Sequence, residues 1–377
     1  MPDTSYIWQL PDWPNWQYES RVLAPLLGSV RLAQGRLLGR MQDLGMTVQS
    51  QANLSMLTED VIKTSAIEGE TLSLETVRSS VARKMGLDIG SLAPTDRMVD
   101  GIVDVVLDAT AKADSPLTAS RLFAWHAALF PTGRSGMVAI DVGVWRSDAT
   151  GAMQVVSGPL HRQKVHFEAP PAERLAKETD IFLRWFNQSE TDEPVIKAGL
   201  AHLWFVTLHP FDDGNGRIAR AIGDMALSRA EGLAPRYYSL SAQIQRERNA
   251  YYDELEAAQK DSLDITRWLM WFLGCLLRAL EGAELSLAAV LFKARFWRVW
   301  AHTPMNERQI NVLDRFLSGF DGFEGKLTSR KWAAIAKCSA DSALRDINDL
   351  IAQGVLCKDP SGGRSSSYVL AELSEAR

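Results

Sequence analysis

The chain has 377 residues, of which 46% are hydrophobic and 23% charged, and its net charge is −5. This length predicts two to three domains with a large apolar core. The acidic balance argues against a general binder of nucleic acid or of anionic membranes. The most apolar run, residues 268–277, is too short to span a bilayer. The first residues lack the features of a secretory signal and the three cysteines lack metal-ligand spacing, so we expect a cytoplasmic protein.

Residues 1–85 form the predicted N-terminal region. This region opens with a segment rich in tryptophan and proline, and we expect the tryptophans to pack as a structural lid. Helical patterns follow, the last of them over residues 57–70. Thr64 and Glu68 are four positions apart and therefore lie on one side of this helix, which Gly69 ends. Taken alone, the pattern is typical of an ordinary helix end.

Residues 86–285 form the predicted central region, which contains a candidate hairpin. Residues 138–146 and 154–167 contain short β-branched runs separated by Gly, Pro and polar residues, which indicates paired strands. A helical pattern follows over residues 172–187. The hairpin is either a structural element packed on the helices or an edge to which another chain adds a strand.

The most informative segment is HPFDDGNGRIAR, residues 209–220. Pro210 cannot continue the apolar helix before it, and the Gly, Asn and Asp residues favour a turn. An apolar pattern resumes immediately afterwards and predicts a second helix, whose start leaves unpaired N–H groups that attract an anion. Gly214 and Gly216 allow the backbone to approach a phosphate closely.

Charged and titratable side chains complete this segment. Arg217 and Arg220 share one face of the second helix and can grip a polyphosphate from one side. Asp213 offers the carboxylate oxygen that a magnesium ion prefers. His209, at the entrance of the loop, is suited to act as a general base near neutral pH. The segment therefore predicts a phosphate site with a catalytic base.

Every fixed position of the segment matches the signature of the Fic family, H-P-F-x-D-G-N-G-R-x-x-R, so the chain resembles a Fic protein. Most members transfer AMP from ATP to a hydroxyl side chain of a target protein. The resemblance implies that His209 accepts the proton of a target Ser, Thr or Tyr, that Asp213 holds Mg²⁺, and that Phe211 is a buried anchor. The residues that the resemblance assigns to the phosphates are Gly214, Asn215, Gly216, Arg217 and Arg220.

The same resemblance gives a role to two segments upstream. Thr64-x-x-x-Glu68-Gly69 is similar to the family's inhibitory helix motif, [S/T]-x-x-x-E-[G/N]. In that family the Glu pairs with the second motif Arg, here Arg220, and prevents the productive pose of ATP. The predicted hairpin resembles the family's flap, along which the target segment pairs as an added strand. The docking edge would be Val165, His166 and Phe167.

Residues 242–259 predict a helix on which Tyr252, Glu256 and Gln259 share one face. Fic proteins place a Tyr and an Asn or Gln against the adenine here. We therefore expect Tyr252 and Gln259 to contact the base. Gln259 differs from the commoner Asn and leaves base selectivity open, and a Tyr that merely packs on the helix surface is the alternative.

Residues 286–377 predict a separate C-terminal domain. Helical patterns at 307–317, 329–337 and 339–353 precede two strands with a Gly-Gly turn over 355–370, an order typical of a winged helix. Residues 326–364 carry seven basic against four acidic side chains. The predicted recognition helix has three Asp and one Arg, which is unfavourable toward DNA phosphates. We expect protein docking or dimerisation rather than DNA binding.

The sequence thus predicts a mainly α-helical protein, a Fic-type helical bundle with a β-hairpin flap, an N-terminal helical region and a C-terminal winged helix. The resemblance implies a protein adenylyltransferase that uses ATP and Mg²⁺, is inhibited by Glu68, and modifies a target protein or itself. One alternative is removal of AMP by the same pocket. Another is a nucleotide-sensing transcriptional regulator or scaffold. Members of the family often form homodimers, although the sequence does not show the oligomeric state.

Overall fold

The computed structural model of this protein describes residues 6–42, 44–89, 92–149, 151–158, 162–188, 193–232, 236–260, 262–318, 326–360 and 367–371. The chain divides into two compact units, Met1–Ala283 and Glu284–Arg377, and the boundary falls within a long helix. The three-part division predicted from the sequence stays a proposal.

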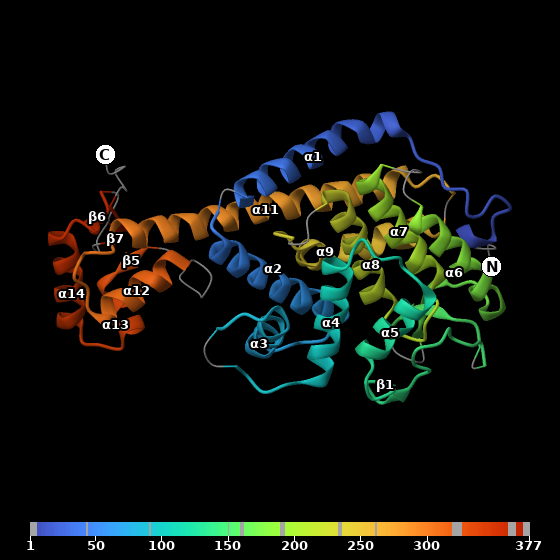
Figure 1. The fold of residues 1–377 in the computed structure, drawn as a ribbon, viewed down its shortest axis with the longest axis horizontal. Coiled ribbons are helices and arrows are strands. Elements are labelled where there is room, and N and C mark those ends of the chain that lie inside the picture. Colours follow the sequence, from blue (N-terminus) through green and yellow to red (C-terminus); the bar gives the residue numbers. More distant parts are fainter. Residues whose placement is uncertain are drawn as a thin grey trace. The chain divides into compact units, whose positions relative to one another are not determined.

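The first unit consists of helices with two short hairpins (Figure 1). Its elements are, in chain order, the 3-10 helix η1 (Ile7–Gln9), α1 (Ser20–Gln42), α2 (Met46–Ile67), α3 (Leu74–Met85), α4 (Arg97–Ala111), α5 (Ala119–Leu129), β1 (Arg134–Ser135), β2 (Val138–Ala139), β3 (Gln154–Ser157), β4 (Lys164–Glu168), α6 (Ala172–Asn187), α7 (Pro194–Leu208), α8 (Asn215–Glu231), α9 (Leu240–Arg246), α10 (Arg248–Ala258) and the beginning of α11 (Thr266–Val299).

Helix α7 is the core helix of this unit because it is apolar on all sides. Its residues from Ala198 to Leu208 are all buried, as expected for a helix without a polar face. Helix α8 packs along α7, and α4 and α2 contact α8 in turn (Figure 1). The C-terminal end of α2 is thereby brought to the beginning of α8, where the segment 209–220 lies.

The N-terminal tryptophans pack on the helical core. Trp13 and Trp16 make edge contacts with Trp204 of α7, with ring centroids 6.2 and 5.9 Å apart. The indole N–H of Trp13 donates to Glu178 of α6 at 2.9 Å. These contacts agree with the structural role predicted for the tryptophans, since large aromatic rings contribute most when buried against one another.

The two hairpins differ from the predicted pairing of residues 138–146 with 154–167. Strand β1 pairs with β2, and β3 pairs with β4. Beyond β2 the chain leaves the sheet, and the backbone N–H of Arg146 donates instead to the carbonyl of Pro210. In the β3–β4 pair the register shifts so that His166 is bulged, and the residues at the turn, 159–161, lie outside the described part of the chain.

The helix predicted over residues 242–259 is two helices, whereas the one predicted over 172–187 coincides with α6. Helix α9 ends at Arg246 and α10 begins at Arg248, because Glu247 between them has φ −107° and ψ 26°. The carboxylate of Glu247 accepts hydrogen bonds from Gln243 and Arg278. This side-chain pairing fixes a bend that an amphipathic pattern does not reveal.

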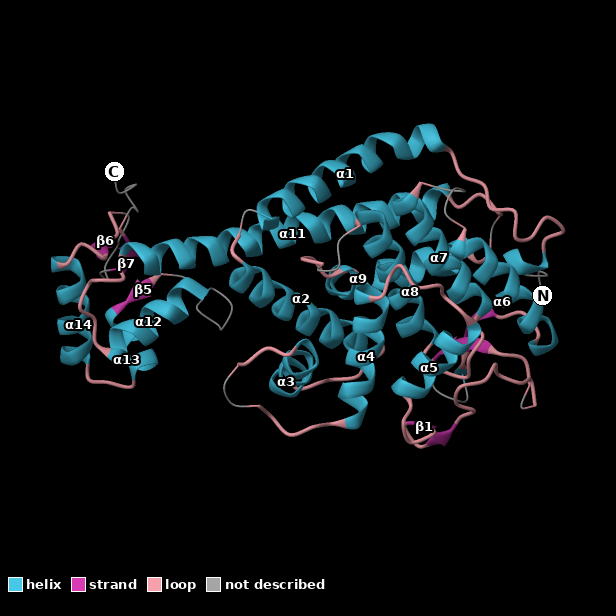
Figure 2. Cartoon of the chain, in the orientation of Figure 1, coloured by secondary structure: helices cyan, strands magenta, loops and turns pink. Residues whose placement is uncertain are grey.

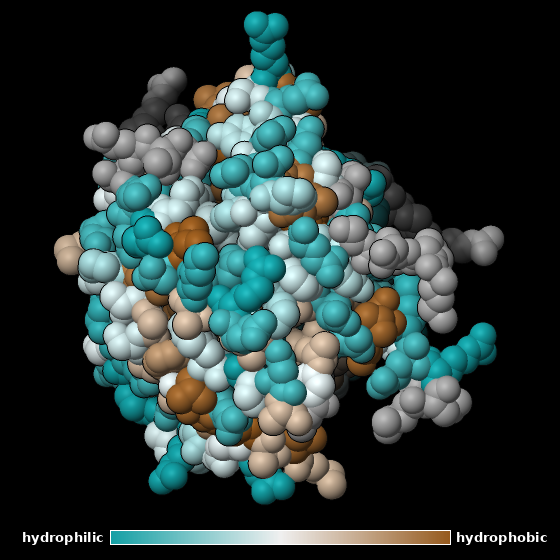
Figure 3. Space-filling view, turned by 90° about the vertical axis from the view of Figure 1, so that its right-hand side faces the viewer, coloured by the Kyte–Doolittle hydropathy of each residue, from teal (hydrophilic) through white to brown (hydrophobic). Residues whose placement is uncertain are grey.

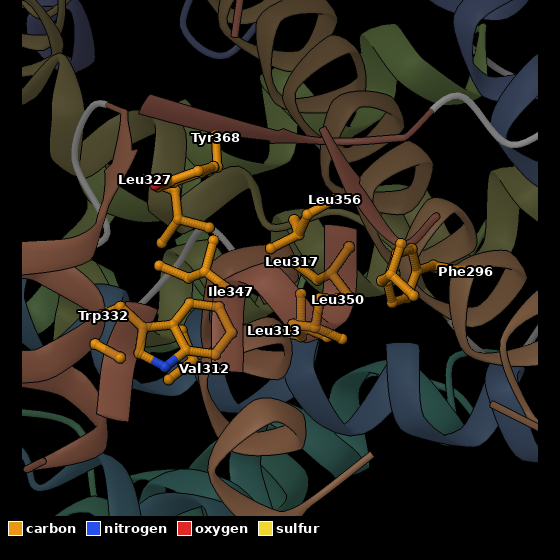
Figure 4. Close-up of a cluster of buried hydrophobic side chains, with 12 residues drawn as sticks. Phe296, Val312, Leu313, Leu317, Leu327, Trp332, Ile347, Leu350, Leu356 and Tyr368 are labelled. Carbon is orange, nitrogen blue, oxygen red and sulfur yellow. The ribbon is translucent and has the colours of Figure 1, made fainter. Parts of the chain in front are cut away.

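The second unit has a small core of its own. Its elements after α11 are α12 (Glu307–Ser318), β5 (Leu327–Thr328), α13 (Ser329–Ala336), α14 (Ala340–Ala352), β6 (Leu356–Lys358) and β7 (Ser367–Leu370), with the antiparallel strands in the order β5-β7-β6. Figure 4 shows Leu313, Trp332 and Ile347, from the three helices, among the buried side chains of this core. The helices and strands follow the predicted order, while the winged-helix assignment stays a prediction, and the predicted Gly-Gly turn lies outside the described residues.

The charge on α14 is distributed differently from the expectation. Asp346 was counted among the acidic side chains that would disfavour DNA phosphates, but it is buried and accepts hydrogen bonds from Asn306 and Arg308 at 3.0 Å. Asp349 accepts a hydrogen bond from Gln309 at 2.8 Å. Both carboxylates therefore join α14 to the start of α12, and the buried charge of Asp346 requires such partners.

The prediction of a mainly helical fold is confirmed, and the short strands are confined to the hairpins and to the small C-terminal sheet (Figure 2). Among the described residues, no helix has both the length and the apolar content that a bilayer crossing requires. The face seen in Figure 3 is largely hydrophilic, with hydrophobic side chains in separate spots. Isolated apolar residues of this kind are normal on protein surfaces.

Candidate active site

The segment between α7 and α8 is a tight loop with two left-handed residues. Helix α7 ends at His209, which has φ 46° and ψ 55°, and α8 begins after Gly214, which has φ 78°. A side chain at position 214 would meet the ring of Phe130 at 2.9 Å, so glycine is required there by backbone conformation and by space. No side chain caps the first turn of α8. The N–H groups of that turn are therefore available to an anion.

Asn215 holds the loop closed. Its side-chain oxygen accepts from the N–H of Phe211 at 3.0 Å, and its side-chain nitrogen donates to the carbonyl of the same residue at 2.7 Å. The ring of Phe211 is fully buried and stacks on His126, with centroids 4.2 Å apart. The resemblance placed Asn215 with the phosphate-binding residues, which stays a prediction, and its side chain here fixes the backbone of the loop.

His209 has the protonation and orientation of a base. Its Nδ1 lies 3.2 Å from the carbonyl oxygen of Val206, which favours the tautomer with the proton on Nδ1 and leaves Nε2 as the acceptor. Burial lowers the pKa of His209 to about 4, although hydrogen bonding to Val206 acts in the opposite direction. The imidazole is therefore neutral at pH 7 and able to accept a proton.

Arg146 supports this geometry and was missed by the sequence analysis. Its Nε donates to the carbonyl of His209 at 2.8 Å, and one terminal nitrogen donates to the carbonyl of Pro170, just after β4. Its other terminal nitrogen is paired with Asp148 at 2.7 Å. Arg146 is buried, and these bonds tie the loop that begins at His209 to the base of the β3–β4 hairpin. The only hint of Arg146 in the sequence was its position as a basic residue at the end of an apolar run, VGVWR.

Arg217 and Arg220 lie on one face of α8, as expected, and both are almost completely buried. Arg217 is 4% exposed and Arg220 is 3% exposed. Within the described part of the chain, Nε of Arg217 and Nη1 of Arg220 are buried without a hydrogen-bond partner. Guanidinium N–H groups without acceptors are costly inside a protein, so this face of α8 favours an oxygen-rich ligand.

The end of α2 meets Arg220 directly. Nε of Arg220 donates to the hydroxyl of Thr64 at 2.7 Å, and its Nη2 donates to the carboxylate of Glu68 at 2.7 Å and to the carbonyl of Thr64 at 3.0 Å. A Cβ at Gly216 would lie 2.3 Å from the Glu68 carboxylate, so only glycine leaves room for this approach. The two distant motifs are thereby joined in space.

A second acidic residue, Glu70, reaches the other arginine. Its two carboxylate oxygens lie 3.1 and 3.2 Å from Nη1 of Arg217. The carbonyl of Ile67, the last residue of α2, accepts a hydrogen bond from Nε of Arg248 at 2.7 Å. Neither Glu70 nor Arg248 was predicted from the sequence. The inhibitory motif ends at Gly69, and contacts between residues so far apart leave no local pattern.

Asp213 lies at the other side of the loop. One of its oxygens accepts from the N–H of Gly214, and the other accepts from the hydroxyl of Ser135 in β1. Its side chain is 43% exposed. Asp212 points elsewhere and accepts from the N–H of Asp141 at 2.9 Å. Among the described residues no group of three acidic, His or Cys side chains forms a complete metal cage.

The residues expected to contact adenine have different partners and different exposure. Tyr252 is partly exposed beside the end of α2, with its hydroxyl 3.4 Å from the carbonyl of Ile67. Gln259 is buried, and its side-chain nitrogen donates to the hydroxyl of Thr207 at 3.3 Å. Glu256 is paired with His166 and Lys260. The adenine assignment of Tyr252 and Gln259 stays a prediction.

The three residues expected at the docking edge differ in exposure. Val165 is exposed, His166 is partly buried between Ser157 and Glu256, and Phe167 is fully buried against Trp8. The side chain of Phe167 is therefore not available to a docking segment. The docking role stays a prediction for all three.

Comparison with known proteins yields two family matches. Residues 116–227 match the Fic/DOC family, and residues 6–87 match a domain of unknown function, DUF4172. Over 223 residues the chain is 30% identical to the protein adenylyltransferase Fic of Culex quinquefasciatus, covering 57% of this chain and 39% of that protein. It is 25% identical over 229 residues to the protein of the same name from Nematostella vectensis, covering 59% and 48%. The chain thus spans less than half the length of these curated relatives.

Solved structures are similar in fold. A Fic family protein from Desulfovibrio desulfuricans matches with a TM-score of 0.52 and 21% identity, covering 94% of this chain and 97% of that one. Fic-1 from C. elegans matches with a TM-score of 0.50 and 21% identity, covering 72% and 75%. At these identities the likeness concerns the fold alone.

Proposed function

This chain is a Fic family protein with its Fic/DOC domain at residues 116–227, and from that premise we propose that it is a protein adenylyltransferase held inactive by the end of α2. The proposed reaction transfers AMP from ATP to a Ser, Thr or Tyr hydroxyl of a target protein or of the chain itself. The single observation that carries the proposal is the contact of Glu68 with Arg220 at the uncapped start of α8.

The phosphate site is proposed from the geometry of this helix start. The free N–H groups of the first turn and the conformations of Gly214 and Gly216 suit an anion. Arg217 and Arg220 add two buried cations with hydrogen-bonding capacity left over. A polyphosphate would satisfy these donors, and the carboxylates now beside them are the groups that it would displace.

The residues of the loop fit a magnesium ion. Mg²⁺ is commonly held by one or two carboxylates together with substrate phosphates rather than by a complete protein cage. The partly exposed carboxylate of Asp213 offers such oxygen ligands, with its orientation fixed by Ser135 and Gly214. When bound, the ion would neutralise part of the charge of the phosphates.

His209 is proposed as the general base. In the reaction, the target hydroxyl oxygen forms a bond to the α-phosphorus while its proton passes to Nε2 of His209. The bond between the α-phosphorus and the bridging oxygen breaks, and pyrophosphate leaves with the electron pair. The fixed tautomer of His209 and its neutral state support this role. Arg146 would act as a positioning residue, because it holds the carbonyl of His209.

Autoinhibition is proposed because α2 occupies a group that ATP requires. Thr64 and Glu68 together take up two nitrogens of Arg220, and Arg248 holds the last carbonyl of α2 in place. The side chain of Glu68 is 30% exposed, so it can leave this position without passing through the core. Removing its carboxylate would free Arg220 for a phosphate.

The target is proposed to dock along the β3–β4 hairpin, with Val165, His166 and Phe167 at the edge, and adenine to lie near Tyr252 and Gln259. The hairpin is tied to the catalytic loop through Arg146, which supports this placement. A second candidate function is the removal of AMP from a modified protein. It is supported by the same contact, because a carboxylate beside the phosphate site could orient a water molecule.

The experiment incubates the purified chain with Mg²⁺ and ATP labelled in the α-phosphate. We expect Glu68→Gly and Glu68→Gln to label themselves well above the wild type, and the double variant Glu68→Gly with Arg220→Ala to lose the gain. Glu59→Gln, on the same helix, is the matched control and should behave like the wild type. Unchanged labelling in both Glu68 variants would contradict autoinhibition. Loss of label from pre-modified protein would favour removal, and bound nucleotide with neither activity would favour sensing.

A further inference from the structure

The end of α2 presents two carboxylates in a fixed geometry. Gly69 has φ 85°, its N–H donates to the carbonyl of Ala66 at 3.1 Å, and the N–H of Glu70 donates to the carbonyl of Ser65 at 3.0 Å. These two bonds and the left-handed glycine form a Schellman motif, which closes many helices. Glu68 and Glu70 flank the glycine and are therefore positioned by the same cap.

The two carboxylates take one arginine each. Glu68 is bonded to Arg220 at 2.7 Å, and both oxygens of Glu70 lie within 3.2 Å of Nη1 of Arg217. The sequence motif, which ends at Gly69, contains only the first of these pairs. In the described structure both cations of the phosphate site are therefore paired with the same helix end.

Arg217 is a buried residue of the proposed phosphate site and not a surface residue. It is 4% exposed, its guanidinium lies 5.0 Å above the ring of Phe130, and its Nε is buried without a partner among the described residues. Asp213 is its other acidic neighbour, at 3.9 Å. A phosphate that bonds Arg217 must therefore compete with Glu70.

We propose that Glu70 is a second inhibitory carboxylate, which occupies the Arg217 anion subsite and excludes the phosphates of nucleoside diphosphates and triphosphates beyond the α-phosphate. The inference rests on the proposed nucleotide site and adds to it a separate group with a separate arginine. Because Glu70 and Glu68 belong to one cap, a shift of that cap would release both arginines together. Changing Glu68 alone would leave Arg217 still paired.

Glu70 can be tested without harming the fold. Its side chain is 33% exposed, and partly exposed ion pairs contribute little to stability. Glu70→Gln keeps the size and the hydrogen-bonding capacity but removes the charge. Glu75→Gln is the matched control. Glu75 lies five positions further along, exposed in the first turn of α3, and its replacement changes the net charge of the chain by the same amount.

The experiment measures binding of ADP and of AMP to the full chain by calorimetry. We expect Glu70→Gln to bind ADP roughly twofold to fivefold more tightly than the wild type, in the range of a partly exposed charge pair, and to bind AMP unchanged. Glu75→Gln should match the wild type for both. The double variant Glu68→Gln with Glu70→Gln should exceed either single change.

The outcomes separate this inference from the proposed function. If Glu68→Gln binds ADP more tightly while Glu70→Gln equals Glu75→Gln, the inference is wrong and the proposed function stands. An equal gain for AMP and ADP in Glu70→Gln would also overturn it, because the competition would not depend on the further phosphate. If no variant binds either nucleotide, the proposed nucleotide site is wrong and the inference falls with it.

Discussion

The starts of α8 and α14 are built in opposite ways. Helix α8 follows Gly214 in a left-handed conformation, without a side-chain cap, and two buried arginines lie in its first turns. Helix α14 follows Ser339, whose hydroxyl accepts from the N–H of Ser342 at 3.2 Å, and Asp341 lies in its first turn. Both segments were expected from the sequence to begin helices, and both were considered as phosphate-binding elements.

The difference indicates which features suit the N-terminus of a helix to bind an anion. A capped start has fewer free N–H groups, and an acidic residue in the first turn already uses the positive end of the helix dipole. The start of α8 has neither. Glu68 and Glu70, which contact its two arginines, come from the end of α2, so a ligand could displace them. We therefore expect the strongest functional effects at α8 and structural effects alone at α14.

The largest effect is expected from His209→Ala. Loss of a general base typically reduces the rate by about 10²–10⁴, and the change should leave ATP binding nearly intact because the proposed phosphate site lies at the start of α8. The measurement is labelling by the Glu68→Gly variant with and without the His209 change, alongside calorimetric ATP binding. Near-normal labelling would contradict the assignment of the base. A parallel loss of ATP affinity would show that the start of α8 does not bind phosphates independently.

The pH dependence of labelling tests the state of His209. Its pKa lies at about 4, mainly because of burial, so the neutral base persists as the pH falls and is lost only near that value. For Glu68→Gly, kcat/KM should therefore stay nearly constant from pH 8 to 5. A base with the ordinary pKa of about 6.5 would lose roughly thirtyfold at pH 5. The negative charge of Glu68 raises the pKa of His209, so removing Glu68 should lower that pKa further.

A smaller effect, on stability as well as activity, is expected from Asn215→Ala. The change leaves the buried N–H and carbonyl of Phe211 without partners, which costs about 1–3 kcal/mol. Denaturant unfolding would measure the loss, and ATP affinity should fall with it because the loop is no longer closed. Ser339→Ala is the comparison at α14. Its loss of a cap should cost about 1 kcal/mol and leave ATP affinity unchanged.

No effect is expected when the chain is mixed with random duplex DNA at physiological ionic strength. The start of α14 is capped and carries Asp341, while the side chain of Arg345 on the same helix lies 3.4 Å from the hydroxyl of Ser342. A mobility-shift assay at several salt concentrations would measure binding, which should be absent or confined to low salt. A sequence-selective shift at physiological salt would break the contrast between the two helix starts.

The local patterns predicted most helices well and some pairings poorly. Helix α6 coincides with its predicted range because its apolar residues repeat regularly. The predicted helix over 242–259 is broken at Glu247, where pairing with Arg278 outweighs the local preference. The segment 138–146 resembled a strand because of its β-branched residues. Its last residue, Arg146, instead donates hydrogen bonds to the carbonyls of His209 and Pro210. Hydrophobic periodicity cannot indicate such contacts.

The sequence by itself determined the mainly helical fold and the turn and helix start at residues 209–220, because glycines, proline and charged residues at fixed spacing act through local backbone geometry. It also indicated Glu68 and Arg220 as partners through resemblance. The tertiary structure alone decided that Glu70 reaches Arg217 and that Phe167 is buried beneath the N-terminal segment. Such contacts join residues far apart in the chain. Their existence depends on how helices pack, and packing is set by the whole apolar core rather than by any short segment.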